Sequence, residues 1–167
     1  MNSPDLDRAR LLLDQHAPTG RGLPPAGSGR WSGAEILEHL GRAYAGTASI
    51  MEKCAADGVP RGTTPSIGQR AWTALVVTAG YLPSGVRAPA VTLPQGLPDD
   101  EAEAFVRARL RDLDAAAAGC LDRFGPRTRV ANHPLLGGFT VPQWCRFHWV
   151  HTRHHTRQLA ARYGGRR

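Results

Sequence analysis

A long amphipathic segment near the C-terminal end constrains this 167-residue chain more than any other feature. It begins with TVPQ at residues 140–143, a capping box in which Thr140 and Gln143 satisfy the first free N–H groups of a helix. The segment contains no glycine until Gly164, and glycine is the residue that ends helices most readily. The pattern predicts a helix from Thr140 to about Tyr163.

One face of this predicted helix carries polar and aromatic residues where a bundle helix normally has leucine or valine. At about 100° per residue, five positions fall within a sector of roughly 80°. These positions are Trp144, His148, His151, His155 and Gln158. Phe147 and Leu159 flank the sector, so we expect it to face the protein interior. Because buried imidazoles need polar partners, several of them in one place favour a shared cation.

The pair His151 and His155 stands at i and i+4, so both side chains point the same way and can share one ion. Neutral imidazole binds zinc, nickel, copper and iron. Histidines at this spacing also occur on solvated helix faces, and the spacing alone leaves both interpretations open. A third ligand from another helix would decide between them. His39 is the candidate, although by itself a core histidine bonded to a neighbour is the better explanation of it.

Four further helices are predicted, and no segment shows the sustained period-two alternation of a strand. Their ranges are 4–16, with Ser3 as N-cap, 32–56, which opens with a capping box at Ser32 and Glu35, 67–78, and 99–124, which opens with acidic residues. Residues 17–30, 81–98 and 133–138 are rich in glycine or proline. We therefore expect an all-α fold: a four-helix bundle with an additional short helix and long Pro/Gly-rich connections.

Length and composition are those of a single globular domain over residues 1–167, with an N-terminal helix and loop (1–30) and the motif-bearing bundle (31–163). No apolar run approaches the roughly 18 residues of a membrane span, and no secretory leader is recognisable. Three widely separated cysteines, Cys54, Cys120 and Cys145, favour reduced thiols. These features predict a cytoplasmic protein with no membrane association.

The net charge of +7 raises nucleic acid as a partner, but the basic residues argue against it. Lys53 is the only lysine, and the arginine excess together with abundant alanine, glycine and proline resembles the codon bias of a GC-rich genome. The basic residues are also spread along the chain, apart from a cluster near the C-terminal end. We expect a small-molecule substrate rather than nucleic acid.

Two separated segments resemble the DinB-like superfamily. The first reads WSxxEILxHL over residues 31–40, and the second reads HPLLGxFTxxQW over 133–144 followed by HxxHxxHHxxQ over 148–158. They are most similar to a branch with the pattern HPxxGxxTxxQW followed by HxxHHxxQ. The chain departs from that branch at Leu135 and Leu136, where an aromatic pair is usual, and at Thr156, where a leucine is usual.

The resemblance implies an up-down-down-up four-helix bundle that forms a homodimer. It also implies that His39, His151 and His155 bind one divalent metal and leave coordination positions open. Around them, the candidates for a supporting or substrate-contacting role are His148, Gln158, Trp144 and His154, with a plain packing or surface role the better interpretation of His154. His133 is interpreted as a turn residue rather than a ligand.

Three imidazoles with open positions are typical of catalytic zinc sites, in which the ion activates a bound water or a thiolate. Enzymes of the resembled superfamily use low-molecular-weight thiols such as mycothiol and bacillithiol. We therefore expect a metal-dependent enzyme, a thiol-dependent transferase or a hydrolase, that uses zinc or nickel, or else iron or manganese. The alternatives are a non-catalytic bundle that binds metal or a small ligand, and a natural-product tailoring enzyme. Glu35 and Glu38 flank His39, and neither is assigned as a general base.

Overall fold

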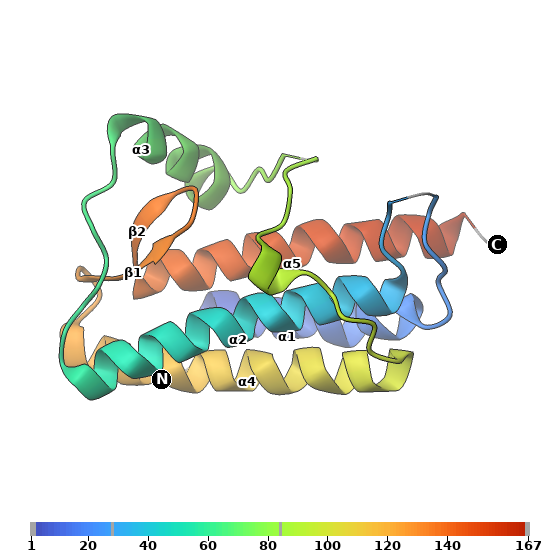
Figure 1. The fold of residues 1–167 in the computed structure, drawn as a ribbon, viewed down its shortest axis with the longest axis horizontal. Helices are drawn as coiled ribbons and strands as arrows, with labels where there is room; N and C mark the ends of the chain where they lie inside the picture. The colour runs from blue at the N-terminus through green and yellow to red at the C-terminus, as the bar shows by residue number, and fades with distance from the viewer. Residues whose placement is uncertain (1–2, 28, 84, 166–167) are drawn as a thin grey trace.

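A computed structural model describes residues 3–27, 29–83 and 85–165 of the chain. Helices make up most of this part of the chain, and a small two-stranded sheet completes it (Figure 1). The long helices are α1 (Pro4–His16), α2 (Gly33–Asp57), α4 (Asp99–Phe124) and α5 (Val141–Gly164). They lie side by side, with α2 packed along α4 and α1 packed along α5. The predicted ranges of these four helices are confirmed to within one residue at each end.

Capping explains where the long helices begin. The Ser32 hydroxyl accepts from the Glu35 N–H at 3.1 Å, and the Glu35 carboxylate accepts from the Ser32 N–H at 2.6 Å. Thr140 and Gln143 make the same reciprocal pair at the start of α5. Both predicted capping boxes are therefore confirmed. Ser3 occupies the N-cap position of α1 but makes no side-chain capping bond there.

The expectation that the chain has no sheet is wrong. Strands β1 (Arg129–His133) and β2 (Gly137–Thr140) form an antiparallel hairpin just before α5. Each strand is too short for alternation to be visible, and its buried residues are adjacent rather than alternate. Backbone N–H groups at 61–63 bond to β1, which covers the edge of the hairpin. The predicted turn at 133–138 is the tip of this hairpin.

The predicted helix over 67–78 is α3 (Ile67–Thr73) followed by a π-helical turn, Ala74–Thr78. Val76 is buried, whereas Trp72 and Leu75 are 50% and 38% exposed. A capping box that the sequence reading missed, Ser66 with Gln69, starts the helix.

Two arginines of α5 hold the end of this segment. Arg146 and Arg153 donate to the carbonyl oxygens of Val77 and Gly80, respectively. Both guanidinium groups lie over the Trp149 ring, at 4.1 and 4.4 Å from its centroid. Guanidinium groups over an indole stabilise such an arrangement through cation–π attraction. The short helix is therefore attached to α5 at its C-terminal end.

Residues 82–83 and 85–98 belong to the long connection that crosses α2 before α4 begins (Figure 1). Among its described residues, it contains one 3₁₀ turn, Ala90–Thr92. A second 3₁₀ turn, Ala17–Gly20, lies in the predicted loop after α1. The core between the helices is made of wholly buried apolar side chains, among them Leu6, Leu13, Leu37, Leu40, Met51, Leu110, Leu113 and Leu159.

The cysteines are free thiols, and all three are buried. Within the described ranges, no helix has the combination of length and apolar character that crossing a bilayer demands.

Candidate metal centre

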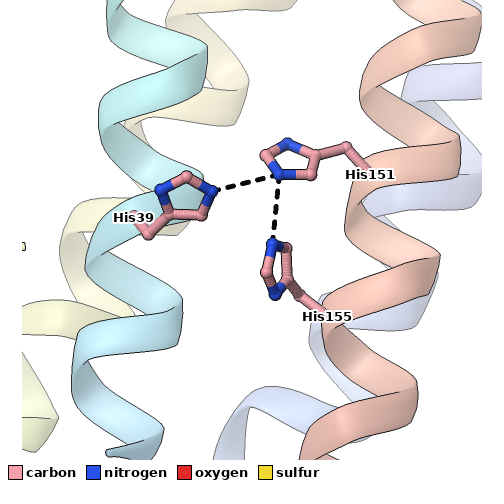
Figure 2. A group of neighbouring side chains, drawn as sticks. All are labelled: His39, His151 and His155. Atoms are coloured by element: carbon pink, nitrogen blue, oxygen red, sulfur yellow. Dashed lines mark hydrogen bonds between the residues drawn. The ribbon is translucent and has the colours of Figure 1, made fainter. Parts of the chain in front are cut away.

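Three histidines from two helices converge in the interior of the protein. His39 lies two turns into α2, while His151 and His155 lie one turn apart on α5, and their rings point toward one another (Figure 2). The Nε2 atom of His151 lies 3.1 Å from the Nε2 atom of His39 and 3.1 Å from that of His155. All three residues are buried, with 4–8% of their surface exposed. The three predicted ligands are thus close enough to hold a metal ion.

Hydrogen bonds on the far side of two rings decide which nitrogen faces the centre. The Nδ1–H of His39 donates to the backbone carbonyl of Thr92 at 2.9 Å, and the Nδ1–H of His155 donates to the Gln158 side-chain oxygen at 2.9 Å. Because both acceptors are carbonyl oxygens, the proton of each neutral ring lies on Nδ1. The Nε2 lone pairs of His39 and His155 are therefore directed at His151. Such supporting bonds are typical of histidines that ligate metals.

Without a cation, His151 cannot donate a hydrogen bond to the Nε2 atoms of both His39 and His155. A neutral ring carries one proton, so its Nε2–H can donate to His39 or to His155 but not to both. Its Nδ1 atom is also buried and has no hydrogen-bond partner among the described residues. A shared cation at the meeting point would accept all three Nε2 lone pairs, and the proton of His151 would then lie on Nδ1. The nitrogen arrangement therefore fits a metal ion better than it fits a closed set of hydrogen bonds.

The spacing of the nitrogens also fits a first-row divalent ion. With metal–nitrogen bonds of about 2.05 Å, two ligand nitrogens are about 2.9 Å apart at 90° and about 3.4 Å apart at the tetrahedral angle. The two distances of 3.1 Å fall between these values. Three protein ligands in this geometry leave at least one coordination position for a water or a substrate.

Burial keeps these histidines in the neutral form that ligates metal. Burial and, to a smaller extent, His39 and His154 lower the pKa of His155 to about 3, against the opposing effect of its hydrogen bond to Gln158. The pKa of His151 is lowered well below its usual value, first by burial and then by the histidines around it. Burial also lowers the pKa of His39, against the opposing effect of the Thr92 carbonyl. At neutral pH no proton has to leave these rings before a cation binds.

Glu38, the residue before His39, is wholly buried and anchors the connection that crosses α2. Its carboxylate accepts backbone N–H bonds from Gln95, Gly96 and Leu97 at 2.8–3.0 Å and an Arg42 Nε–H bond at 2.8 Å. Burial raises the pKa of this carboxyl, but the four hydrogen bonds outweigh burial and lower it overall. Every oxygen of Glu38 is thus engaged in holding the loop that carries Thr92.

The four residues for which we expected a supporting or substrate-contacting role lie in two different places. Gln158 joins two histidines: its oxygen accepts from His155, and its amide donates to His154 Nε2 at 3.0 Å. His154 is therefore oriented through Gln158 and lies half-buried beside the centre. Both residues also line the pocket described below.

His148 and Trp144 form a separate layer, one turn and two turns before the ligand pair. The His148 Nε2–H donates to the Thr47 hydroxyl at 3.0 Å, because that hydroxyl already donates to the carbonyl oxygen of Ala43. Trp144 stacks on His148 with ring centroids 5.7 Å apart and donates to the carbonyl of Ala131. Neither side chain reaches the three Nε2 atoms through a hydrogen bond in the described part of the chain.

Two contributors to the centre were missed by the sequence reading. The Trp31 ring lies against His39, with ring centroids 4.6 Å apart, and its position before the capped helix could have indicated this contact. Thr92 acts through its backbone carbonyl, so its side chain carries no signal in the sequence.

A pocket of about 1400 Å³ opens above the three histidines. Its walls include Trp31, Thr47 and Phe147, together with residues of the connection at 82–83, 85–89 and 91–92. Leu135 and Leu136 of the hairpin turn also line it, at the place where the resembled branch has aromatic residues. The centre is thus accessible to a small molecule while most of its lining is apolar.

His133, which we interpreted as a turn residue, is the last residue of β1, and its side chain holds the turn that follows. Its Nδ1 atom accepts backbone N–H bonds from Leu135 and Leu136 at 3.2 and 3.3 Å. Burial lowers its pKa to about 4.

A family model described as "Protein of unknown function (DUF1569)" matches residues 4–162, which is nearly the whole chain. No curated protein matches the chain significantly, and no solved structure does.

Proposed function

The chain belongs to the DUF1569 family, and we propose that it is a metal-dependent enzyme that acts on a small molecule at a three-histidine centre. In this proposal His39, His151 and His155 hold one divalent transition metal, with zinc or nickel the best fit to three imidazoles. The observation that carries it is the meeting of three buried Nε2 atoms, two of which have lone pairs directed at the third.

A divalent ion bound there would supply Lewis acidity, which polarises a carbonyl group or favours the anionic form of a water or thiol. We therefore propose a thiol-dependent transferase or a hydrolase. Glu38 takes no part in proton transfer in this proposal, because its carboxylate is enclosed by four hydrogen bonds. Glu35 is likewise occupied in the capping box.

The remaining residues of the centre hold the ligands and exclude water. Thr92 and Gln158 keep the protons of His39 and His155 on Nδ1. Trp31 and Phe147 pack against the ligand rings, at 4.6 Å from His39 and 5.5 Å from His151 between centroids. A lining of this kind strengthens electrostatic interactions inside the pocket because it lowers the local dielectric constant.

We also propose that the fold is a DinB-like bundle with up-down-down-up topology. The directions in which the four long helices run in Figure 1 support this topology. The placement of His39 on the second long helix and of His151 and His155 on the last supports the same relationship.

Elemental analysis of purified protein tests the metal centre. We expect about one divalent ion per chain in the wild type and a loss of most of it in His39→Ala, His151→Ala and His155→Ala. His16→Ala, on α1 and outside the centre, is the control and should keep its metal. Wild-type metal content in all three ligand variants would refute the assignment.

Two further measurements test the enzyme. Circular dichroism of the metal-depleted protein should retain its helicity, because a hydrophobic core joins the helices independently of the centre. Collapse of the fold on metal removal would favour an ion with a structural role. Assays with a panel of thiols and electrophiles should then give turnover that His151→Ala lacks, and the absence of any such difference would refute the catalytic part.

A further inference from the structure

We infer that the pocket above the histidine centre takes an organic anion with an apolar body. The inference rests on the proposed function in one respect only: the anion is the substrate, or a close analogue of it, for the proposed enzyme. The arginines and the apolar lining of the pocket do not depend on whether a metal is bound.

Every formally charged side chain that lines the pocket is an arginine. Four arginines contribute to the lining: Arg30, Arg42, Arg87 and Arg162. No aspartate or glutamate lies among the described residues that line it. A cleft with charges of one sign and apolar walls focuses its electric field and raises the local concentration of the opposite ion. Such a pocket attracts anions and repels cations.

Arg42 contributes a guanidinium group to the lining, where it forms an ion pair with Glu38. It lies one turn after His39 on the same face of α2 and is half-buried. Its Nε–H is bonded to Glu38, whose carboxylate is buried and also accepts three backbone N–H bonds. Because only Nε is used in this contact, the two Nη groups remain to meet a ligand carboxylate.

Arg162 places a second positive charge on the other side of the centre. It lies two turns after His155 on α5, and it donates to the carbonyl oxygens of Trp31, at 2.9 Å, and Pro24. Trp31 precedes α2 whereas Arg42 follows His39, so the two arginines flank the centre from opposite ends. Within the described part of the chain, Arg162 has no carboxylate partner, so its positive charge is not neutralised.

The walls between these charges are apolar. Trp31 and Phe147 pack on the ligand histidines, and Val76 and Leu82 contribute from the segment that follows α3. Apolar walls with a few converging polar groups are typical of pockets for small organic ligands. The combination favours a carboxylate attached to an aromatic or aliphatic group over an inorganic anion or a sugar.

Isothermal titration with three probes of one shape tests the inference: 4-phenylbutyrate, 4-phenylbutyramide and 4-phenylbutylamine. We expect the carboxylate to bind about tenfold more tightly than the amide, and the amine to bind most weakly. The advantage of the carboxylate should shrink as salt is raised, because screening weakens the arginine field. The same order should hold in zinc-loaded and in metal-depleted protein.

Arg87→Gln is the main variant, because Arg87 is exposed on the crossing connection and its replacement leaves the core intact. It should weaken carboxylate binding about threefold at low salt and leave amide binding unchanged. Arg111→Gln removes the same charge from an exposed position on α4 that does not line the pocket, and it should change neither. Arg42→Gln should give a larger loss, provided that circular dichroism finds it folded.

Amine binding as tight as carboxylate binding would overturn the inference, as would equal effects of Arg87→Gln and Arg111→Gln, or no binding of any probe. Because the order is measured with and without metal, the two proposals fail separately. If the metal assignment is refuted, the order of the three probe affinities in metal-depleted protein still tests the anion proposal. If the order of the probe affinities is reversed in zinc-loaded protein, the anion proposal is refuted but the metal assignment is not.

Discussion

Replacing His148 by glutamine should remove a defined part of the acid sensitivity of the metal-depleted protein. His148 is 1% exposed, and burial lowers its pKa to about 3, with a smaller contribution from His133. The unfolded chain binds a proton at this residue below its usual pKa of 6.5, whereas the folded protein does so only near pH 3. Stability is therefore lost as the pH falls from 6.5 toward 3.

The size of the effect follows from these two pKa values. At about pH 7.5 the residue contributes almost no difference, and at about pH 5 proton uptake by the unfolded chain destabilises the fold by about 2 kcal/mol. The glutamine amide can still donate to the Thr47 hydroxyl but does not titrate. Loss of the ring contacts with Trp144 and Tyr44 adds a constant of about 1 kcal/mol that does not depend on pH.

Urea denaturation followed by circular dichroism, at several pH values and with a chelator present, measures the difference. The free energy of unfolding of His148→Gln relative to the wild type should rise by about 2 kcal/mol between about pH 7.5 and 5. Thr47→Val removes the hydroxyl but keeps the imidazole, so it should follow the wild-type pH dependence. Parallel curves for His148→Gln and the wild type would refute the reasoning, since they would mean that the folded protein protonates His148.

Four other substitutions have expected outcomes. Glu38→Gln should lower the free energy of unfolding by about 3 kcal/mol in urea denaturation, because its amide group would face N–H donors; wild-type stability would contradict this. Gln158→Ala should lower metal affinity about tenfold in chelator competition by releasing His155, and unchanged affinity would contradict it. Gly41→Ala should destabilise by about 1–3 kcal/mol, since its Cβ would lie 2.5 Å from an aromatic ring of α4. Gly46→Ala, on the same helix with nothing within 4 Å, should instead stabilise by about 0.5–1 kcal/mol, and equal effects of the two would contradict the packing argument.

The long helices could be predicted because their signals are local. The capping boxes at Ser32 and Thr140 and the run of proline before α4 mark the ends, and periodicity marks the buried faces. The hairpin could not be predicted in the same way. Its strands are stabilised by contacts with residues 61–63, far away in sequence, and such pairing leaves no periodic trace in segments of four or five residues.

The candidate site also depends partly on local signals, which could be predicted, and partly on long-range contacts, which could not. Helix geometry brings His151 and His155 to one face, and the family resemblance added His39. The environment of the three rings depends on long-range packing that no spacing records. The chain brings Thr92 to His39 only because the connection folds back across α2.

That connection touches the centre almost entirely through its main chain. The carbonyl of Thr92 orients His39, and three successive backbone N–H groups at 95–97 bind Glu38. The identity of most side chains in the connection is therefore independent of the ligand geometry. Residues such as Val91, which face the pocket from this segment, are free to change in size and polarity. An engineer could thus redesign which molecule the pocket accepts by varying this segment, while α2 and α5 keep the histidines where they are.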